Sequence, residues 1–277
     1  MATAPRITGR DVDAAKAAAR KVVETHRKLS AWLRPGVTLA QVDVFVAKTL
    51  DEMGARSCFL GYKVPRSPAF PSYACLSVNE CVVHGTAGYY TPPMKPGDVL
   101  KIDIGVFFEG WVGDAAWTYI FGEMTPLVKR LTDCGKEALR RGVQTLQAGK
   151  PYINWAREVQ TCVESKPPDG YGFHLIRGLG GHGYGRRLHG PPFISNTVPM
   201  HMGEWPDSMT IAAPGTLLAV EPMIAVGTGQ TIQPKNQWPI FTQDGSLSVH
   251  YEHDVLIHEK GPMILTEGLE LVKDVVN

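Results

Sequence analysis

The sequence predicts an α+β fold made of two similar halves that arose by internal duplication. Two observations support this prediction. The expected order of elements is helix, helix, strands, and this order occurs twice along the 277 residues. An octet with a Pro-Gly turn, a strand and a carboxylate also occurs twice, at 96–103 and 214–221. We therefore expect one domain over residues 1–277, with pseudo-symmetric halves at about 10–122 and 126–265.

Four stretches have the apolar spacing of helices that bury one face. A Pro-Gly turn at 35–36 ends the first stretch, and Thr38 can cap the second. The expected helices span residues 9–33, 39–53, 126–148 and 153–165.

Between residues 56 and 122, short β-prone runs alternate with Pro and Gly turns, and similar runs return from residue 171 onward. The two octets begin strands in these regions and end in Asp103 and Glu221. Two related halves would bring these two carboxylates together at a central cleft.

Composition narrows the class of protein. The net charge is +1, with 44% hydrophobic and 20% charged residues, so no nucleic acid or anionic membrane is indicated as a partner. The five cysteines form no CxxC pair, which argues against a disulfide framework or a cysteine zinc site. With neither an export signal nor a membrane-length apolar run, a cytoplasmic location is expected.

Four acidic residues lie in strand-like, largely apolar surroundings: Asp103, Asp114, Glu221 and Glu252. Taken alone, Asp103 is better explained as a residue on an exposed strand face. Burying an unpaired carboxylate costs several kcal/mol, so four such acids together favour a bound cation cluster.

Three histidines lie next to glycines, which allow close approach of backbone or substrate: His84, His182 and His189. The other six are expected at the surface or in the core: His26, His174, His201, His250, His253 and His258. Residues 178–183 fit G-x-G-x-x-G, but prolines at 191 and 192 forbid the helix that a dinucleotide site needs.

Six segments together resemble type I methionine aminopeptidases: NECVVHG (79–85), KIDIG (101–105), GD (113–114), GHGYGR (181–186), VEPM (220–223) and YEH (251–253). The resemblance runs from about residue 10 to 260 and implies the pita-bread fold. In that fold, two pseudo-symmetric halves form a curved antiparallel sheet with helices on its outer face. The 32 residues from His189 to Glu221 favour type I over type II, which has a helical insertion there.

The resemblance also implies a site for two divalent ions (Co, Mn, Fe or Zn). The implied ligands are Asp103, Asp114, His182, Glu221 and Glu252. His182 and Glu221 would bind one ion and Asp103 mainly the other, while Asp114 and Glu252 would bridge both. A hydroxide bridging the ions would attack the first peptide carbonyl, with Glu221 as general base.

The resemblance implies further roles around the ions. His84 and His189 would hydrogen-bond the substrate and stabilise the tetrahedral intermediate. The implied methionine pocket consists of Phe59, Tyr62, Cys75, Leu188 and Trp238. A monovalent cation is implied near Asn79 and Ser248.

The implied substrate is the N-terminus of a peptide or nascent chain with a small second residue. Transient ribosome contact and a monomeric state are expected. Four features depart from the family's usual pattern: segment 63–71, segment 195–213, Gly190-Pro191 and the bulky Phe59. They affect the expected shape of the pocket.

Two other interpretations of the function are compatible with the same fold. One is a proline-specific aminopeptidase or prolidase, which usually carries an extra N-terminal domain. The other is a non-catalytic binding module, which typically loses metal ligands, whereas all five are present here; a metal-free creatinase-like hydrolase is disfavoured for the same reason.

Overall fold

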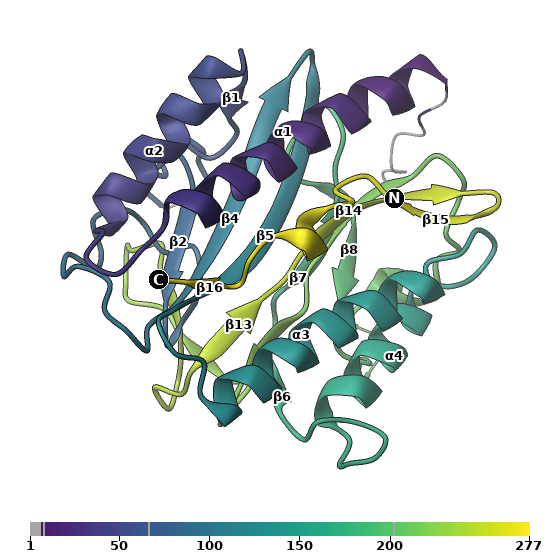
Figure 1. Ribbon diagram of the computed structural model, residues 1–277. Helices are drawn as coiled ribbons and strands as arrows, with labels where there is room; N and C mark the ends of the chain where they lie inside the picture. The colour runs from purple at the N-terminus through teal and green to yellow at the C-terminus, as the bar shows by residue number, and fades with distance from the viewer. Residues whose placement is uncertain (1–6, 8, 66, 202) are drawn as a thin grey trace.

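The computed structural model describes residues 7, 9–65, 67–201 and 203–277. Residues 1–6 and 8 of the predicted domain, together with Arg66 and Met202 in the two atypical loops, lie outside the described residues. Helices flank antiparallel sheets in the described part of the chain (Figure 1), which agrees with the predicted α+β class.

The four predicted helices are present. They are α1 (Arg10–Trp32), α2 (Leu39–Glu52), α3 (Pro126–Thr145) and α4 (Ile153–Glu164). Thr38 forms a capping box with Gln41 at the start of α2, and the Thr125 side chain accepts a hydrogen bond from the Val128 amide in α3. α3 ends at Thr145, earlier than the predicted residue 148, because residues 146–150 form turns.

In the described residues, the other elements are strands of two to 11 residues and two 3₁₀ helices. The strands of the first half are β1 (Arg56–Ser57), β2 (Cys75–Val78), β3 (Cys81–Val83), β4 (Val99–Phe108) and β5 (Trp111–Phe121). Those of the second half are β6 (His174–Leu175), β7 (Gly180–Gly183), β8 (Gly190–Ser195), β9 (Leu217–Val220), β10 (Met223–Ala225), β11 (Thr231–Ile232), β12 (Ile240–Thr242), β13 (Ser248–His250), β14 (His253–His258), β15 (Gly261–Ile264) and β16 (Val275–Val276). The 3₁₀ helices are η1 (Pro206–Met209) and η2 (Leu269–Leu271).

Two antiparallel strand pairs lie at the centre of the molecule. β4 pairs with β5 inside a sheet of order β1-β4-β5-β16, in which β2 also pairs with β4. β9 pairs with β14 inside a sheet of order β15-β14-β9-β7-β8. Smaller three-stranded sheets have the orders β13-β10-β6 and β11-β12-β3.

The two central pairs are joined by hydrogen bonds between β5 and the start of β14. The Glu252 amide donates to the Ala116 carbonyl at 2.9 Å, and the Asp114 amide donates to Asp254 Oδ2 at 2.8 Å. Residues that are far apart in sequence are thereby held side by side, which is the arrangement that a site shared between the two pairs requires.

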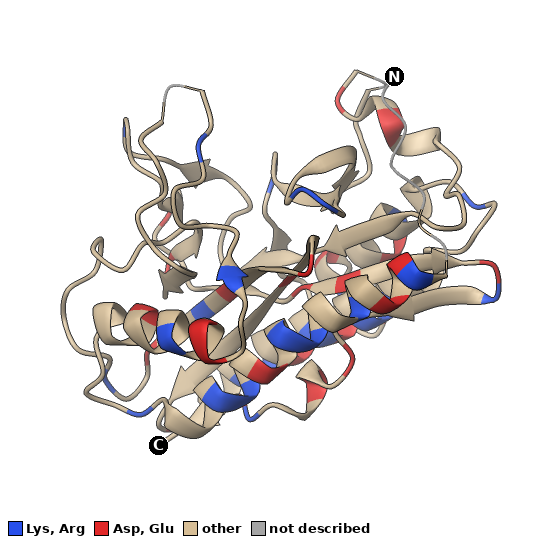
Figure 2. Cartoon of the chain, turned by 90° about the horizontal axis from the view of Figure 1, so that it is seen from above, with Lys and Arg blue, Asp and Glu red and all other residues tan. Residues whose placement is uncertain are grey.

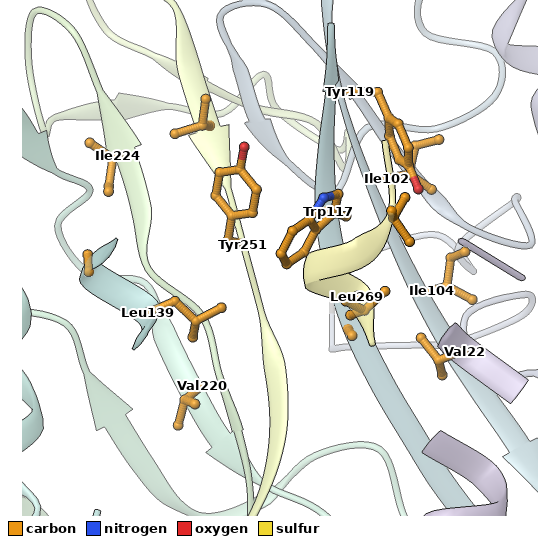
Figure 3. Packing of buried hydrophobic residues seen from close by; sticks show 14 of the residues in the cluster. Val22, Ile102, Ile104, Trp117, Tyr119, Leu139, Val220, Ile224, Tyr251 and Leu269 are labelled. Carbon is orange, nitrogen blue, oxygen red and sulfur yellow. The ribbon is translucent and has the colours of Figure 1, made fainter. Parts of the chain in front are cut away.

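Apolar packing continues from one strand pair to the other. Trp117 of β5 and Tyr251 point toward each other (Figure 3), with ring centroids 4.8 Å apart and planes nearly perpendicular. One continuous cluster of buried residues includes both rings, Val22 of α1 and Leu139 of α3. Burial of this cluster holds the strands against the helices that flank them.

Charged residues lie mainly along the outer faces of the helices. Figure 2 shows acidic and basic residues interspersed on them, consistent with the net charge of +1. Within the described residues, no helix has both the length and the apolar character that crossing a membrane requires.

Candidate metal centre and adjoining pocket

A cavity of about 330 Å³ lies between the two central strand pairs. Every residue predicted as a divalent metal ligand lines it: Asp103, Asp114, His182, Glu221 and Glu252. The cavity is also lined by every residue predicted to contact substrate: Phe59, Tyr62, Cys75, His84, Leu188, His189 and Trp238. The structure therefore brings both predicted sets into one pocket, while the individual roles stay predictions.

The metal-ligand candidates come from strands of both central pairs. Asp103 and Asp114 lie on β4 and β5, where Asp103 faces Ala116 and Asp114 faces Gly105 in the antiparallel register. Glu221 follows β9 directly, and Glu252 precedes β14 directly. Asp103, which its local sequence alone places on an exposed strand face, instead lines the pocket.

Two groups of side chains have donor atoms close enough to hold a metal ion. Asp114, His182 and Glu252 form one group, and Glu221, His250 and Glu252 form the other, with the donor atoms of each group within 4.8 Å of one another. Glu252 belongs to both groups, and Asp103 belongs to neither although it lines the same pocket.

The donor set fits divalent ions. Oδ1 of Asp103 and Oδ1 of Asp114 are buried without a hydrogen-bond partner among the described residues. No lysine or arginine is found among the described residues that line the pocket. These buried carboxylate oxygens have neither a hydrogen-bond donor nor a positive side chain beside them. A bound cation would pair with them and remove the free-energy cost of an unpaired buried charge.

The electrostatics agree with this fit. Burial, and then the nearby Glu221 carboxylate, raises the pKa of Asp103 to about 8, and burial raises the pKa of Glu221 to about 8. Burial, and then neighbouring acids, also raises the pKa values of Asp114 and Glu252. Without a cation, these carboxyls favour their neutral forms, whereas a bound divalent ion would favour the ionised forms.

His182 presents a neutral imidazole to the same space. Burial, and then the neighbouring His189, lowers the pKa of His182 to about 3, and the neutral ring is the form that binds metals. Its strand β7 pairs with β9 at close range, since a Cβ on Gly181 would lie 2.2 Å from the Ala219 carbonyl oxygen. The glycine beside His182 therefore lets β7 approach β9 and so place the imidazole near Glu252.

The two histidines with predicted substrate contacts flank the metal-ligand candidates. His84 follows β3 with a left-handed backbone (φ 57°), and burial lowers its pKa to about 4. The His189 ring lies 4.3 Å from the His182 ring, centroid to centroid. The Tyr62 hydroxyl lies 2.7 Å from His189 Nδ1, and this hydrogen bond fixes the orientation of the ring.

The other end of the cavity is apolar and partly aromatic. Trp238 packs edge-on against Phe70, with centroids 5.3 Å apart, and its Nε1 donates to the Pro68 carbonyl at 3.0 Å. Phe70 also packs edge-on against Phe59 at 6.2 Å. The described part of the proline-rich segment 63–71 is therefore a wall of the pocket rather than a loop remote from it.

Four lining residues were not predicted from the sequence: Val64, Phe70, Val83 and His250. His250, which we expected at the surface or in the core, is buried, and its ring also lies beside Glu221 and Glu252 in the pocket. A signal was available, since His250 precedes Glu252 by two residues and side chains at that spacing share a face in extended chain.

The residues predicted near a monovalent cation, Asn79 and Ser248, are in direct contact. The Asn79 carbonyl oxygen accepts hydrogen bonds from the Ser248 amide and hydroxyl, each at 3.1 Å. It also accepts one from the buried ammonium group of Lys101 at 2.6 Å. The Lys101 amino group, whose pKa burial lowers to about 7, thus already contacts one oxygen of the predicted site, and the monovalent ion itself stays a prediction.

Comparison with known proteins gives one consistent family. The sequence model of "Metallopeptidase family M24" matches residues 13–259. A methionine aminopeptidase from Aquifex aeolicus is 35% identical over 93% of this chain and 96% of its own length. Methionine aminopeptidase 1 from Mycobacterium tuberculosis is 32% identical, with 95% of both chains covered. A crystal structure of a methionine aminopeptidase from Thermotoga maritima superposes with a TM-score of 0.85 at 31% identity, covering 95% of this chain and 99% of that one.

Proposed function

Because the chain belongs to metallopeptidase family M24, we propose that it is an aminopeptidase that removes N-terminal methionine from peptides. The predicted pita-bread fold and the predicted family are both confirmed by this membership and by the similarity to solved methionine aminopeptidases. The observation that carries the proposal is one cavity with five candidate metal ligands at one end and an apolar, aromatic wall at the other.

The residues suggest how the metals would be held. Two divalent ions, drawn from Co, Mn, Fe or Zn, would be bound by five residues: Asp103, Asp114, His182, Glu221 and Glu252. The chemistry that such a pair supplies when bound is polarisation of the scissile carbonyl and a lowered pKa for a water molecule. Four carboxylates offset the charge of two divalent ions, which is the charge balance expected in a buried site.

The side chains around the donors have distinct proposed tasks. Glu221 lines the pocket with the other proposed metal ligands, and its carboxylate would also act as general base and pass a proton to the leaving amine. Neutral His84 and His189 would donate hydrogen bonds to the substrate carbonyl and its tetrahedral intermediate.

The apolar wall would select methionine. The apolar part of the cavity is lined by Phe59, Cys75, Leu188 and Trp238. Tyr62 also lines it, and its hydroxyl is hydrogen-bonded to His189. A flexible thioether side chain makes favourable contacts with aromatic rings and fits irregular apolar cavities. We expect a small second residue to be preferred, with the described parts of segments 63–71 and 195–213 setting how large it can be.

The proposal extends to assembly and location. We infer that residues 1–277 act as one catalytic domain with halves at about 10–122 and 126–265. We also propose that the protein is a monomer and works in the cytoplasm on the N-termini of peptides or nascent chains. It would contact the ribosome transiently.

A peptide panel tests the activity. Peptides based on Met-Ala-Ser are varied at positions one and two and incubated with protein loaded with each candidate metal, and the released amino acid is identified by mass spectrometry. Release of methionine, falling as the second residue grows, supports the proposal. Selective release of the first residue from X-Pro peptides would assign the chain to the proline-specific enzymes instead.

A further inference from the structure

His250 lies in the metal pocket but belongs to no predicted ligand set. It ends β13, is 1% exposed, and lines the same cavity as Glu221 and Glu252. A fully buried imidazole beside two carboxylates needs a partner for its nitrogen atoms.

The distances around His250 fit a shared ion better than a direct hydrogen bond. Its Nε2 lies 3.1 Å from Glu221 Oε2 and 4.0 Å from Glu252 Oε2. Despite the shorter distance, Nε2 has no hydrogen-bond partner among the described residues, so the ring does not direct this nitrogen at the carboxylate. Two donors bound to one ion at about 2.1 Å, at the tetrahedral angle, lie about 3.4 Å apart, which falls between these two distances.

We propose that His250 is a metal ligand, and that the centre contains two imidazoles rather than one. The five proposed ligands would keep their places, and His250 would join Glu221 and Glu252, since one donor atom of each of these three residues lies within 4.8 Å of the others. This inference rests on the proposed two-metal function, and it adds a ligand that the five-residue set lacks.

A second imidazole changes which metals the centre prefers. Imidazole nitrogen suits Zn, Fe and Co, whereas sites made of carboxylates alone suit Mn and Mg. The centre of this protein is therefore expected to favour zinc over manganese more strongly than a centre with one imidazole.

The number of bound imidazoles can be counted in the protein loaded with Co²⁺. Each histidine bound to this paramagnetic ion gives a strongly shifted, exchangeable ring N–H signal in the proton NMR spectrum. We expect two such signals in the wild-type protein with two ions bound, and one in His250→Gln. His174→Gln removes an exposed imidazole and serves as the matched control that retains both signals.

The spectrum of the wild-type protein is decisive even if the variant does not fold. One shifted ring signal with two cobalt ions bound would overturn the assignment of His250 while leaving the two-metal function intact. Failure to bind cobalt at all would instead contradict the proposed function. As a second readout, His250→Gln should weaken Zn²⁺ binding by a larger factor than Mn²⁺ binding, and equal losses for both ions would contradict the inference.

Discussion

Asp254 offers a test of how the two strand pairs position the metal ligands. This residue of β14 is fully buried, and its Oδ2 accepts the backbone N–H of Asp114 at 2.8 Å. It is not itself a predicted ligand, so its effect on metal binding would act through the position of Asp114. We predict that Asp254→Ala weakens divalent metal binding, whereas Asp254→Asn, which keeps an oxygen acceptor at this point, largely preserves it.

The expected size follows from this one contact. Burial raises the pKa of Asp254, and removing its side chain leaves the buried Asp114 N–H without an acceptor, which costs about 1–3 kcal/mol. If most of this energy positions Asp114, metal affinity falls by roughly 10–100-fold, which is also the usual effect of removing a residue that orients a metal ligand. Asp254→Asn should stay within about threefold of wild type on the same reasoning.

The measurement is a competition between the protein and a chelating fluorophore for Zn²⁺ or Mn²⁺. Circular dichroism and urea unfolding of each variant show whether the fold is retained. Wild-type affinity in a folded Asp254→Ala protein would refute the idea that this hydrogen bond positions Asp114, and an equal loss in the Asn variant would show that the charge matters rather than the acceptor.

Three further predictions concern catalysis, packing and pH. His84→Ala should lower kcat about 10²–10³-fold, because it removes a hydrogen-bond donor to the intermediate. The metal content, measured by mass spectrometry, should not change, and His174→Ala is the control. Gly142→Ala should lower the free energy of unfolding by about 1–3 kcal/mol, because the new Cβ would lie 2.6 Å from the Trp155 ring; a gain in stability in urea would contradict this packing. Burial lowers the pKa of His26 from 6.5 to about 4, so the unfolded chain binds more protons between these values. As the pH falls from 6.5 to 4, the free energy of unfolding of the wild type should therefore fall by about 3 kcal/mol more than that of His26→Gln. If the unfolding free energies of the two proteins change with pH in parallel, the prediction is wrong.

Much of the architecture could be read from periodicity and turns. The four helices occur where apolar spacing indicates them, and Thr38, the capping residue expected for the second helix, does cap it. The acids at 103 and 221 were linked by their matching positions after Pro-Gly turns, and they do line one cavity. Such local signals survive folding because the Pro-Gly turns before the two strands fix where each strand begins.

Two contacts that the sequence did not reveal depend on segments that are far apart in the chain. Phe70 lies in a proline-rich segment without a regular pattern, and only its packing against Trp238 makes it part of the pocket. The Lys101 ammonium reaches the Asn79 carbonyl through the fold, although alternation alone could not say what it meets. His250 shares a face with Glu252 in extended chain, but a single histidine in a strand is more often structural than a ligand.

The central claim is that this chain removes methionine with the help of metal ions held by the acids and histidine of one cavity. The most direct test follows metal content and methionine release from Met-Ala-Ser together, while metal-free protein is titrated with Co²⁺, Mn²⁺, Fe²⁺ or Zn²⁺. We predict that release is absent without metal, appears as ions bind, and is lost in Glu221→Ala. Undiminished release from metal-free protein, or no release of methionine by fully loaded wild-type protein with any of the four ions, would contradict the account.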